Sequence, residues 1–391
     1  MYQLNLRHLR MLETIATRGT LSMAARDAGI SQPALTQALA KMEASFGVQL
    51  FERAPKGVEP TSAGGRVLRR VNRGIAHIDR AFHRTSAGAQ KEELGRYLTT
   101  VHLRGLLELA EAGSYMRGAE LAGVSVPAFH RSVRELEQLC DAALVERRGR
   151  GVGLTPTGVK LSRGFMLGVA ELTAALDEAA HGGRRLAIGA MALSRSLLLP
   201  ATLAELLRQS PDAQVDVVEG SYLELVELLR SGRIDVLVGA LRDHPPRDLH
   251  QEALFADRLT IIGRAAHPLA DETASLERLA AYPWIVARRA SGLLDRWQSL
   301  FDDANAPRPT APIHCGSVAL IRGVLVRSDF LTLISPDQVA AEMASGSLIR
   351  IKSVIPDTER VIGAITRRDW YPTPLQESFV KLLKLNAPRK G

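Results

Sequence analysis

The chain has 391 residues, 46% of them hydrophobic and 24% charged, which suits a folded protein of two or three domains and excludes disordered and fibrous classes. The net charge is +8, and residues 1–84 hold 13 Lys and Arg against 6 Asp and Glu, a local net charge of +7 that favours a polyanionic partner for this segment. Two distant cysteines, Cys140 and Cys315, exclude a disulfide framework, and we recognise no secretion signal or apolar span, so we expect a cytoplasmic protein with no membrane partner.

Two short helices joined by a glycine turn are predicted at residues 21–28 and 31–45. Ser31 is a suitable N-cap for the second helix, and Gly29 suits the left-handed conformation of the turn. Apolar residues at i, i+4 and i+7 give the second helix an inward face, so small polar residues point outward. This is the helix-turn-helix pattern, in which the second helix enters the major groove of DNA.

A β-hairpin wing is predicted next, from extended runs at residues 48–53 and 58–61. Glutamine can pair with adenine through two hydrogen bonds, threonine can contact a base edge, and wing cations can reach phosphates. The alternative is a helical hairpin with a solvated polar face. The candidate DNA-binding residues are Ser31, Gln32, Pro33, Thr36, Gln37, Lys41, Arg53 and Lys56.

The whole pattern then repeats at an offset of 94 residues. Residues 8–64 align with residues 102–158 without a gap, which indicates a tandem duplication of one small domain. The inward face persists in the second copy, but the outward face changes, with Val126 in place of Gln32 and Arg131 in place of Gln37. This copy could bind different DNA, add wing contacts or serve as a spacer. Its possible DNA-binding residues are His130, Arg131, Arg147, Arg148 and Arg150.

The first copy resembles the DNA-binding domain of LysR-type transcription regulators. The resemblance rests on Ser31-Gln32-Pro33-Ala34 at the start of the second helix and on Leu50-Phe51-Glu52-Arg53 at the wing. The family implies one such domain, a linker helix that pairs between subunits, and a two-lobed effector domain similar to periplasmic binding proteins. This chain departs from the pattern by carrying the DNA-binding domain twice.

Amphipathic helices are predicted at residues 66–84 and 161–180, and they align with each other and with the linker helix of the family. We favour pairing with a second subunit over packing on their own domains. The predicted class is therefore α+β multidomain. It has winged helix-turn-helix domains at 1–64 and 95–158, linkers at 65–94 and 159–183, and a two-lobed α/β effector domain at 184–391.

Short apolar runs alternate with helical stretches from residue 185 onward, which predicts α/β lobes with mostly parallel sheets. The resemblance places the two crossings between lobes near residues 263–267 and 354–361. Ligands of such lobes lie at the carboxyl ends of strands and against helix N-termini, where anions are favoured. The effector candidates are Met191, Ser194, Ser196, Ser221, Arg288, Ser291 and Ser317. Each serine among them could equally serve only as the N-cap of its own helix.

Other classes of protein fit the sequence less well than a regulator does. No phosphate loop, nucleophile elbow or metal-binding histidine spacing is present, so we expect neither an enzyme nor a cofactor or metal site. A disulfide switch within the effector half is excluded because Cys315 is its only cysteine. The remaining alternative is a DNA-free adaptor on a degenerate regulator scaffold. We expect a homodimer or homotetramer that binds double-stranded DNA and a small, anionic effector and contacts RNA polymerase.

Overall fold

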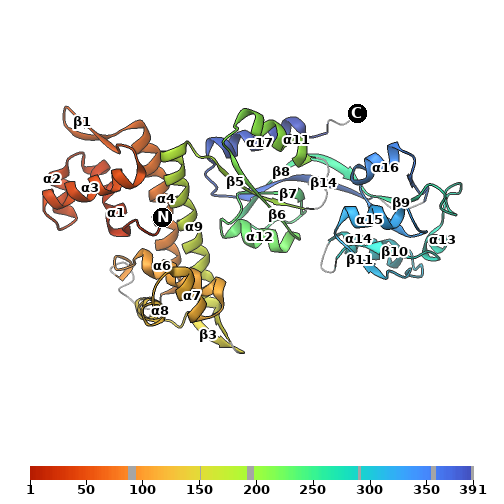
Figure 1. Cartoon of the computed structure of the whole chain (residues 1–391), viewed down its shortest axis with the longest axis horizontal. Helices are drawn as coiled ribbons and strands as arrows, with labels where there is room; N and C mark the ends of the chain where they lie inside the picture. Colours follow the sequence, from red (N-terminus) through yellow and green to blue (C-terminus); the bar gives the residue numbers. More distant parts are fainter. Residues whose placement is uncertain (87–93, 150, 192–197, 289–291, 354–357, 389–391) are drawn as a thin grey trace. The chain divides into compact units, whose positions relative to one another are not determined.

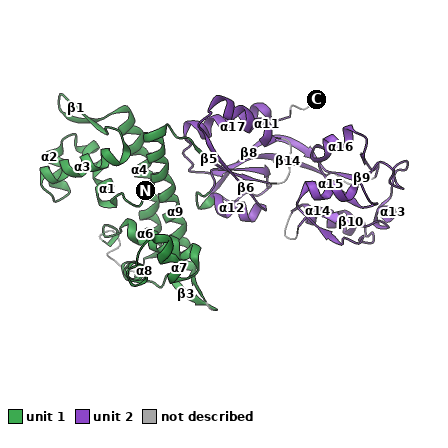
Figure 2. Ribbon diagram, in the orientation of Figure 1, with its two compact units in different colours: residues 1–185, 230–233 green, residues 186–229, 234–391 purple. Residues whose placement is uncertain are grey.

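The computed structural model describes residues 1–86, 94–149, 151–191, 198–288, 292–353 and 358–388. The chain divides into two compact units, residues 1–185 with 230–233, and residues 186–229 with 234–391 (Figures 1 and 2). Among the described helices, none has the length and apolarity needed to cross a membrane.

The first copy of the duplicated domain contains a helix that the sequence analysis missed, α1, ahead of the predicted pair. Ser31 accepts a hydrogen bond from the amide of Ala34 as the N-cap of α3, and Gly47 ends that helix in the left-handed conformation. The strand β1 begins at Phe51 rather than Val48. The elements are α1 (Leu6–Arg18), α2 (Leu21–Asp27), α3 (Gln32–Phe46), β1 (Phe51–Ala54), β2 (Gly57–Pro60) and α4 (Ser62–Thr85).

The second copy reproduces this fold, with α3, β1 and β2 recurring at an offset of 94 residues. Internal hydrogen bonds recur as well. The Leu50 amide donates to Glu43 at 2.8 Å, and the Leu144 amide donates to Glu137 at 2.9 Å. The second copy is therefore a complete winged helix-turn-helix. Its elements are α6 (Thr100–Ala112), α7 (Tyr115–Ala122), α8 (Val126–Cys140), β3 (Val145–Arg148), β4 (Gly151–Leu154) and α9 (Pro156–His181).

The two linker helices, α4 and α9, pack against each other within one chain (Figure 1). Arg70 in α4 contacts Glu178 near the end of α9, whereas Ala81 near the end of α4 faces Gly164, so the helices are antiparallel. The prediction that these faces pair with a second subunit is wrong for this chain. Each apolar stripe is covered by the equivalent stripe of the other copy.

The second unit has two lobes, each built on a five-stranded sheet. The sheet of the first lobe has the strand order β6-β5-β7-β14-β8. Its elements are β5 (Arg185–Ala190), α11 (Leu198–Gln209), β6 (Gln214–Glu219), α12 (Tyr222–Arg230), β7 (Val236–Ala240), β8 (Leu249–Arg258), β14 (Glu359–Arg367) and α17 (Pro374–Asn386). The α+β class with a two-lobed C-terminal domain is confirmed.

The sheet of the second lobe has the order β11-β10-β12-β9-β13. Its elements are β9 (Thr260–Arg264), α13 (Leu276–Ala280), β10 (Trp284–Val286), α14 (Gly292–Asp302), β11 (Ile313–His314), α15 (Val318–Leu325), β12 (Leu331–Ile334), η1 (Pro336–Val339), α16 (Ala340–Ala344) and β13 (Leu348–Arg350). Trp284, Trp297 and Phe301 form a buried aromatic cluster that fixes α14 on this sheet.

Two expectations about the lobes are wrong. The sheets are mixed rather than mostly parallel, because β14 runs antiparallel to β7 and β8, and β9 runs antiparallel to β12 and β13. The first crossing lies between β8 and β9, around Leu259, and not at residues 263–267. The strand β8, which mixes polar with apolar residues and was not predicted, extends the first lobe up to that point. The second crossing lies between β13 and β14, and residues 354–357 of it fall outside the described part.

Candidate nucleic-acid interface and effector cleft

The outward face of α3 carries the predicted polar residues. Gln32, Thr36, Gln37 and Lys41 are all exposed, whereas Leu35, on the opposite face, is buried. The Ser22 hydroxyl of α2 donates to the Gln32 side-chain oxygen at 2.8 Å, which fixes how this amide is presented. The Thr36 hydroxyl donates to the Gln32 carbonyl at 3.0 Å. The hydroxyl thus bonds back to its own helix, and Ser31 serves as the N-cap.

The wing that follows α3 carries two exposed cations in the same helix-turn-helix domain. Arg53 lies on β1, and Lys56 lies in the turn between the hairpin strands. The Val58 amide donates to the Gly19 carbonyl at 2.7 Å, which attaches the hairpin to the end of α1. A Cβ atom on Gly57 would lie 2.0 Å from that carbonyl oxygen, so this close approach requires glycine. The wing cations are therefore held on a fixed hairpin.

The second copy offers a different surface. Arg131 and Arg147 are exposed, but the His130 ring packs on Tyr115 with centroids 4.5 Å apart and is only half-exposed. Arg148 folds back onto its own wing, donating to Glu146 at 2.9 Å and to the Leu154 carbonyl at 3.1 Å. Arg150 lies outside the described residues. Of the predicted cations that the structure describes, Arg131 and Arg147 thus extend most freely from this module.

Four of the seven effector candidates are described, and Ser194, Ser196 and Ser291 fall outside the described residues. Ser317 accepts from the Leu320 amide as the N-cap of α15. The Ser221 hydroxyl accepts from the Glu224 amide at 3.4 Å at the start of α12 and donates to the Glu224 carboxylate at 2.8 Å, so both serines have capping roles. Met191 packs over Gly239, and Arg288 is exposed. The capping explanation holds for the two described serines.

Arg242 is a further cation at this edge of the sheets, and the sequence analysis missed it. It follows β7, and its guanidinium lies 4.5 Å from the centre of the Tyr222 ring, while a Cβ atom on Gly292 of the other lobe would lie 2.8 Å from its Nη1. Gln251 hydrogen-bonds both the amide and the carbonyl of Arg242 and so fixes its backbone. The rule that selected the other candidates, a position directly after a strand, also selects this arginine.

Charges of the two lobes face each other here. Hydrogen bonds from Ser221 lower the pKa of Glu224, and the positive charge of Arg288 on the other lobe lowers it further. Arg242 of the first lobe and Arg288 of the second lobe are thus the two cations described at this edge of the sheets, and the charge of Arg288 acts on Glu224. Guanidinium groups bind carboxylates and phosphates through paired hydrogen bonds. This edge can hold a small anion.

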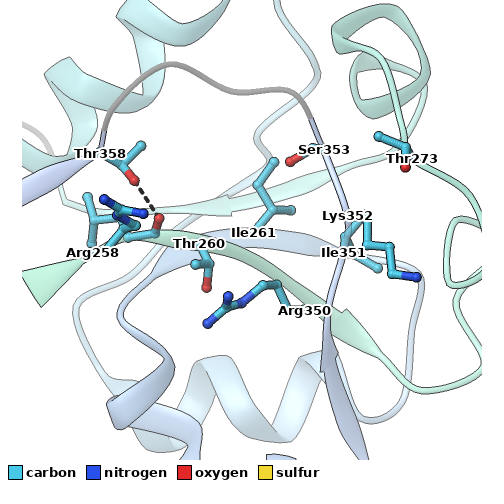
Figure 3. Close-up of a pocket in the computed structure, with 10 residues that line it drawn as sticks. Arg258, Thr260, Ile261, Thr273, Arg350, Ile351, Lys352, Ser353 and Thr358 are labelled. Atoms are coloured by element: carbon cyan, nitrogen blue, oxygen red, sulfur yellow. Dashed lines mark hydrogen bonds between the residues drawn. The ribbon is translucent and has the colours of Figure 1, made fainter. Parts of the chain in front are cut away.

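A cavity of about 630 Å³ lies elsewhere, against the strands that cross between the lobes (Figure 3). Arg258, Arg350 and Lys352 line it, together with Thr260, whose buried hydroxyl has no hydrogen-bond partner among the described residues. The volume suits a small ligand. None of the four effector candidates that the structure describes lines this cavity, so these four residues lie apart from it.

Comparison with known proteins finds matches in both halves of the chain. The model of the LysR substrate binding domain matches residues 179–387. The model of the bacterial regulatory helix-turn-helix protein, lysR family, matches twice, at residues 6–65 and 100–159. The HTH-type transcriptional regulator GalR of Pseudomonas putida is 31% identical over 387 residues, covering 97% of this chain and 96% of that protein. The regulator PcaQ of Agrobacterium fabrum is 30% identical over 278 residues, covering 70% and 89%.

Solved structures share the fold at lower identity. ArgP from Mycobacterium tuberculosis aligns with a TM-score of 0.58 at 20% identity, covering 73% of this chain and 96% of that one. Full-length OxyR from Pseudomonas aeruginosa gives 0.56 at 20% identity, covering 74% and 95%. The duplicated helix-turn-helix, the two-lobed domain and these relatives together show that the chain belongs to the LysR family of transcription regulators, and that it carries the family's DNA-binding domain twice.

Proposed function

We propose that this regulator recognises a specific DNA sequence through α3 and responds to a small anionic metabolite bound between the lobes of its C-terminal domain. Ligand binding would change how the lobes close, and through that change the geometry of a homo-oligomer on DNA and its contact with RNA polymerase. The observation that carries the proposal is the α3 face, where exposed amide and cationic side chains lie next to a wing with two exposed cations.

The chemistry of that face suits direct reading of bases. Gln32 and Gln37 can each donate to and accept from adenine in the major groove, whereas Lys41, Arg53 and Lys56 supply charge for phosphates. The alternative of a DNA-free adaptor does not account for this face. A solvated helix needs no amide held in place by a neighbouring hydroxyl, as Ser22 holds Gln32.

The Gln32→Ala variant tests direct reading. We expect it to weaken binding to a selected duplex by about 1–3 kcal/mol, while leaving binding to unrelated DNA unchanged. Gln3→Ala, an exposed glutamine outside the recognition helix, is the matched control. Affinities are measured at two salt concentrations, because phosphate contacts dominate at low salt. Equal affinity of the Gln32→Ala variant and the control at both concentrations would contradict reading by this residue.

The effector site is proposed at the strand ends, with Arg242 of the first lobe and Arg288 of the second lobe as its cations. An anion there would compete with Glu224 for the positive charge of Arg288. A thermal-shift screen of sugar acids and aromatic acids should identify a stabilising anion, because a ligand that binds the folded state raises its melting temperature.

Two matched variants then locate the site. Arg288→Ala should abolish the ligand-induced rise in melting temperature. Arg350→Ala, which instead changes the cavity at the crossing strands, should leave that rise in place. A shift lost only in Arg350→Ala would move the effector to the cavity of Figure 3. Chemical turnover of the bound acid would contradict the regulator function itself.

A further inference from the structure

The two copies of the duplicated domain meet at equivalent positions. Gly74 and Gly168 are 94 residues apart, and a Cβ atom on either would lie 3.1 or 2.9 Å from the carbonyl oxygen of the other. Gly74 also approaches Leu172, and Gly168 approaches Ile78, its equivalent in the first copy. In a two-fold interface, when residue i contacts j, the equivalent of j contacts the equivalent of i. The helices α4 and α9 therefore form a pseudo-two-fold dimer interface inside one chain.

The charges across this interface are not symmetric. Arg70, whose side chain is 3% exposed, donates to Glu171 at 2.9 Å and to Glu178 at 2.8 Å. Arg73 donates to Glu171 at 3.0 Å. The residue of α9 that is equivalent to Arg70 is Gly164, which approaches His77 and Ala81 of α4. The cation therefore lies on one helix and the carboxylates on the other.

This asymmetry disfavours pairing between identical helices of two chains. An interface of two α4 helices would place each Arg70 against His77 and Arg84, the equivalents of Glu171 and Glu178. An interface of two α9 helices would bury these carboxylates against Gly164 with no cation. A buried charge without its partner is strongly unfavourable. Charge complementarity of this kind specifies which helices pair.

We propose that a single chain is a covalent pseudo-dimer whose helices α3 and α8 read two half-sites of different sequence within one composite operator. The proposal rests on the proposed function, in which α3 enters the major groove. A symmetric dimer of helix-turn-helix domains binds two matching half-sites. Here the same interface joins two unequal recognition helices, so the operator should be unequal as well.

The difference between the half-sites follows from the exposed faces of the two helices. Gln37 of α3 corresponds to Arg131 of α8, and both are exposed. Glutamine pairs with adenine and arginine with guanine in the major groove. Gln32 corresponds to Val126, which is 42% exposed and can contact only an apolar edge such as a thymine methyl. The half-site under α8 should therefore hold guanine where the half-site under α3 holds adenine.

The experiment selects duplexes from a random DNA pool with the full chain and with single variants. We expect a motif of two unlike halves. Arg131→Gln should change the preferred base from guanine to adenine in one half only, with a change in relative affinity of about tenfold or more. Gln37→Ala should relax the other half only. Gln138→Ala, an exposed residue at the opposite end of α8, is the control and should leave the motif unchanged.

The outcomes separate this proposal from the one it rests on. A palindromic motif whose two halves both change in Gln37→Ala and neither in Arg131→Gln would show two first copies from two chains, and would overturn the pseudo-dimer alone. A single half-site would do the same. Failure to select any sequence would overturn the reading of DNA by α3 and the composite operator together.

Discussion

Replacing Gly164 with alanine adds one methyl group to α9. We expect this substitution to destabilise the protein, although glycine to alanine in a helix usually stabilises. In a solvent-exposed helix, glycine to alanine stabilises by about 1 kcal/mol. At Gly164, however, the new Cβ atom would lie 2.1 Å from the Cβ of Ala81 on α4 and 3.3 Å from the His77 carbonyl oxygen. Carbon atoms in contact lie about 3.5–4.0 Å apart, so the helices must separate.

The magnitude follows from these opposing effects. Overpacking of this kind costs about 1–3 kcal/mol, which exceeds or cancels the gain in helix propensity of about 1 kcal/mol. The double variant Gly164→Ala with Ala81→Gly moves the methyl group from one helix to the other, so it should be close to neutral. The coupling energy between the two substitutions should therefore be about 1–3 kcal/mol. Gly65→Ala, in α4 with no atom closer than 4.0 Å, is the control and should stabilise.

Native-state hydrogen exchange of the α4 and α9 amides in the full chain is the appropriate assay, because a chain of several domains has no single unfolding transition. Protection of both helices should fall in Gly164→Ala, recover in the double variant and rise in Gly65→Ala. If Gly164→Ala and Gly65→Ala increase protection alike, and the effects of Gly164→Ala and Ala81→Gly simply add, the pairing of α4 with α9 is refuted.

Three other perturbations test separate parts of the structure. Arg70→Ala should lower the opening free energy of the α4 and α9 amides in native-state hydrogen exchange by about 3–5 kcal/mol, because it leaves Glu171 and Glu178 buried without their main partner; the exposed Arg66→Ala should cost little. Burial raises the pKa of Cys140 to about 11, so iodoacetamide at pH 8 should label this thiol only after unfolding. Burial also lowers the pKa of His267 below 6.5, and its Nδ1 accepts from the Leu269 amide at 3.1 Å. The unfolded state therefore binds the proton more readily, and melting temperature should fall as pH drops below about 6.5.

Local signals made the DNA-binding half predictable from sequence. The N-cap Ser31 and the apolar positions of α3 act within a few residues, and the second copy repeated them at a constant offset. The missed helix α1 begins after an asparagine cap and has no glycine turn before it to mark a motif. Its buried face is evident once Leu9, Leu12 and Ile15 are seen at the core of the first copy.

Features that depend on long-range pairing were less predictable. The strand β8 mixes polar and apolar residues, and it becomes a strand because it pairs along its length with β14, about a hundred residues later in the chain. Arg242 follows a strand that was predicted, but its position between the lobes depends on Tyr222 beside it and on α14 of the other lobe. No local pattern contains that information.

For the linker helices, the sequence correctly predicted a contact surface but wrongly assigned its partner to a second subunit. Their apolar stripes predicted a helix-helix contact, and such a contact exists. The two stripes differ in charge, since α4 holds six arginines and one aspartate, whereas α9 holds three carboxylates against one lysine and one arginine. Ion pairs join Arg70 and Arg73 of α4 to carboxylates of α9. Because the two helices belong to one chain, each meets the other at a high effective concentration, and the ion pairs of Arg70 then favour this pairing over exchange with a second chain. Any wider assembly of the protein must therefore use surfaces other than these two stripes.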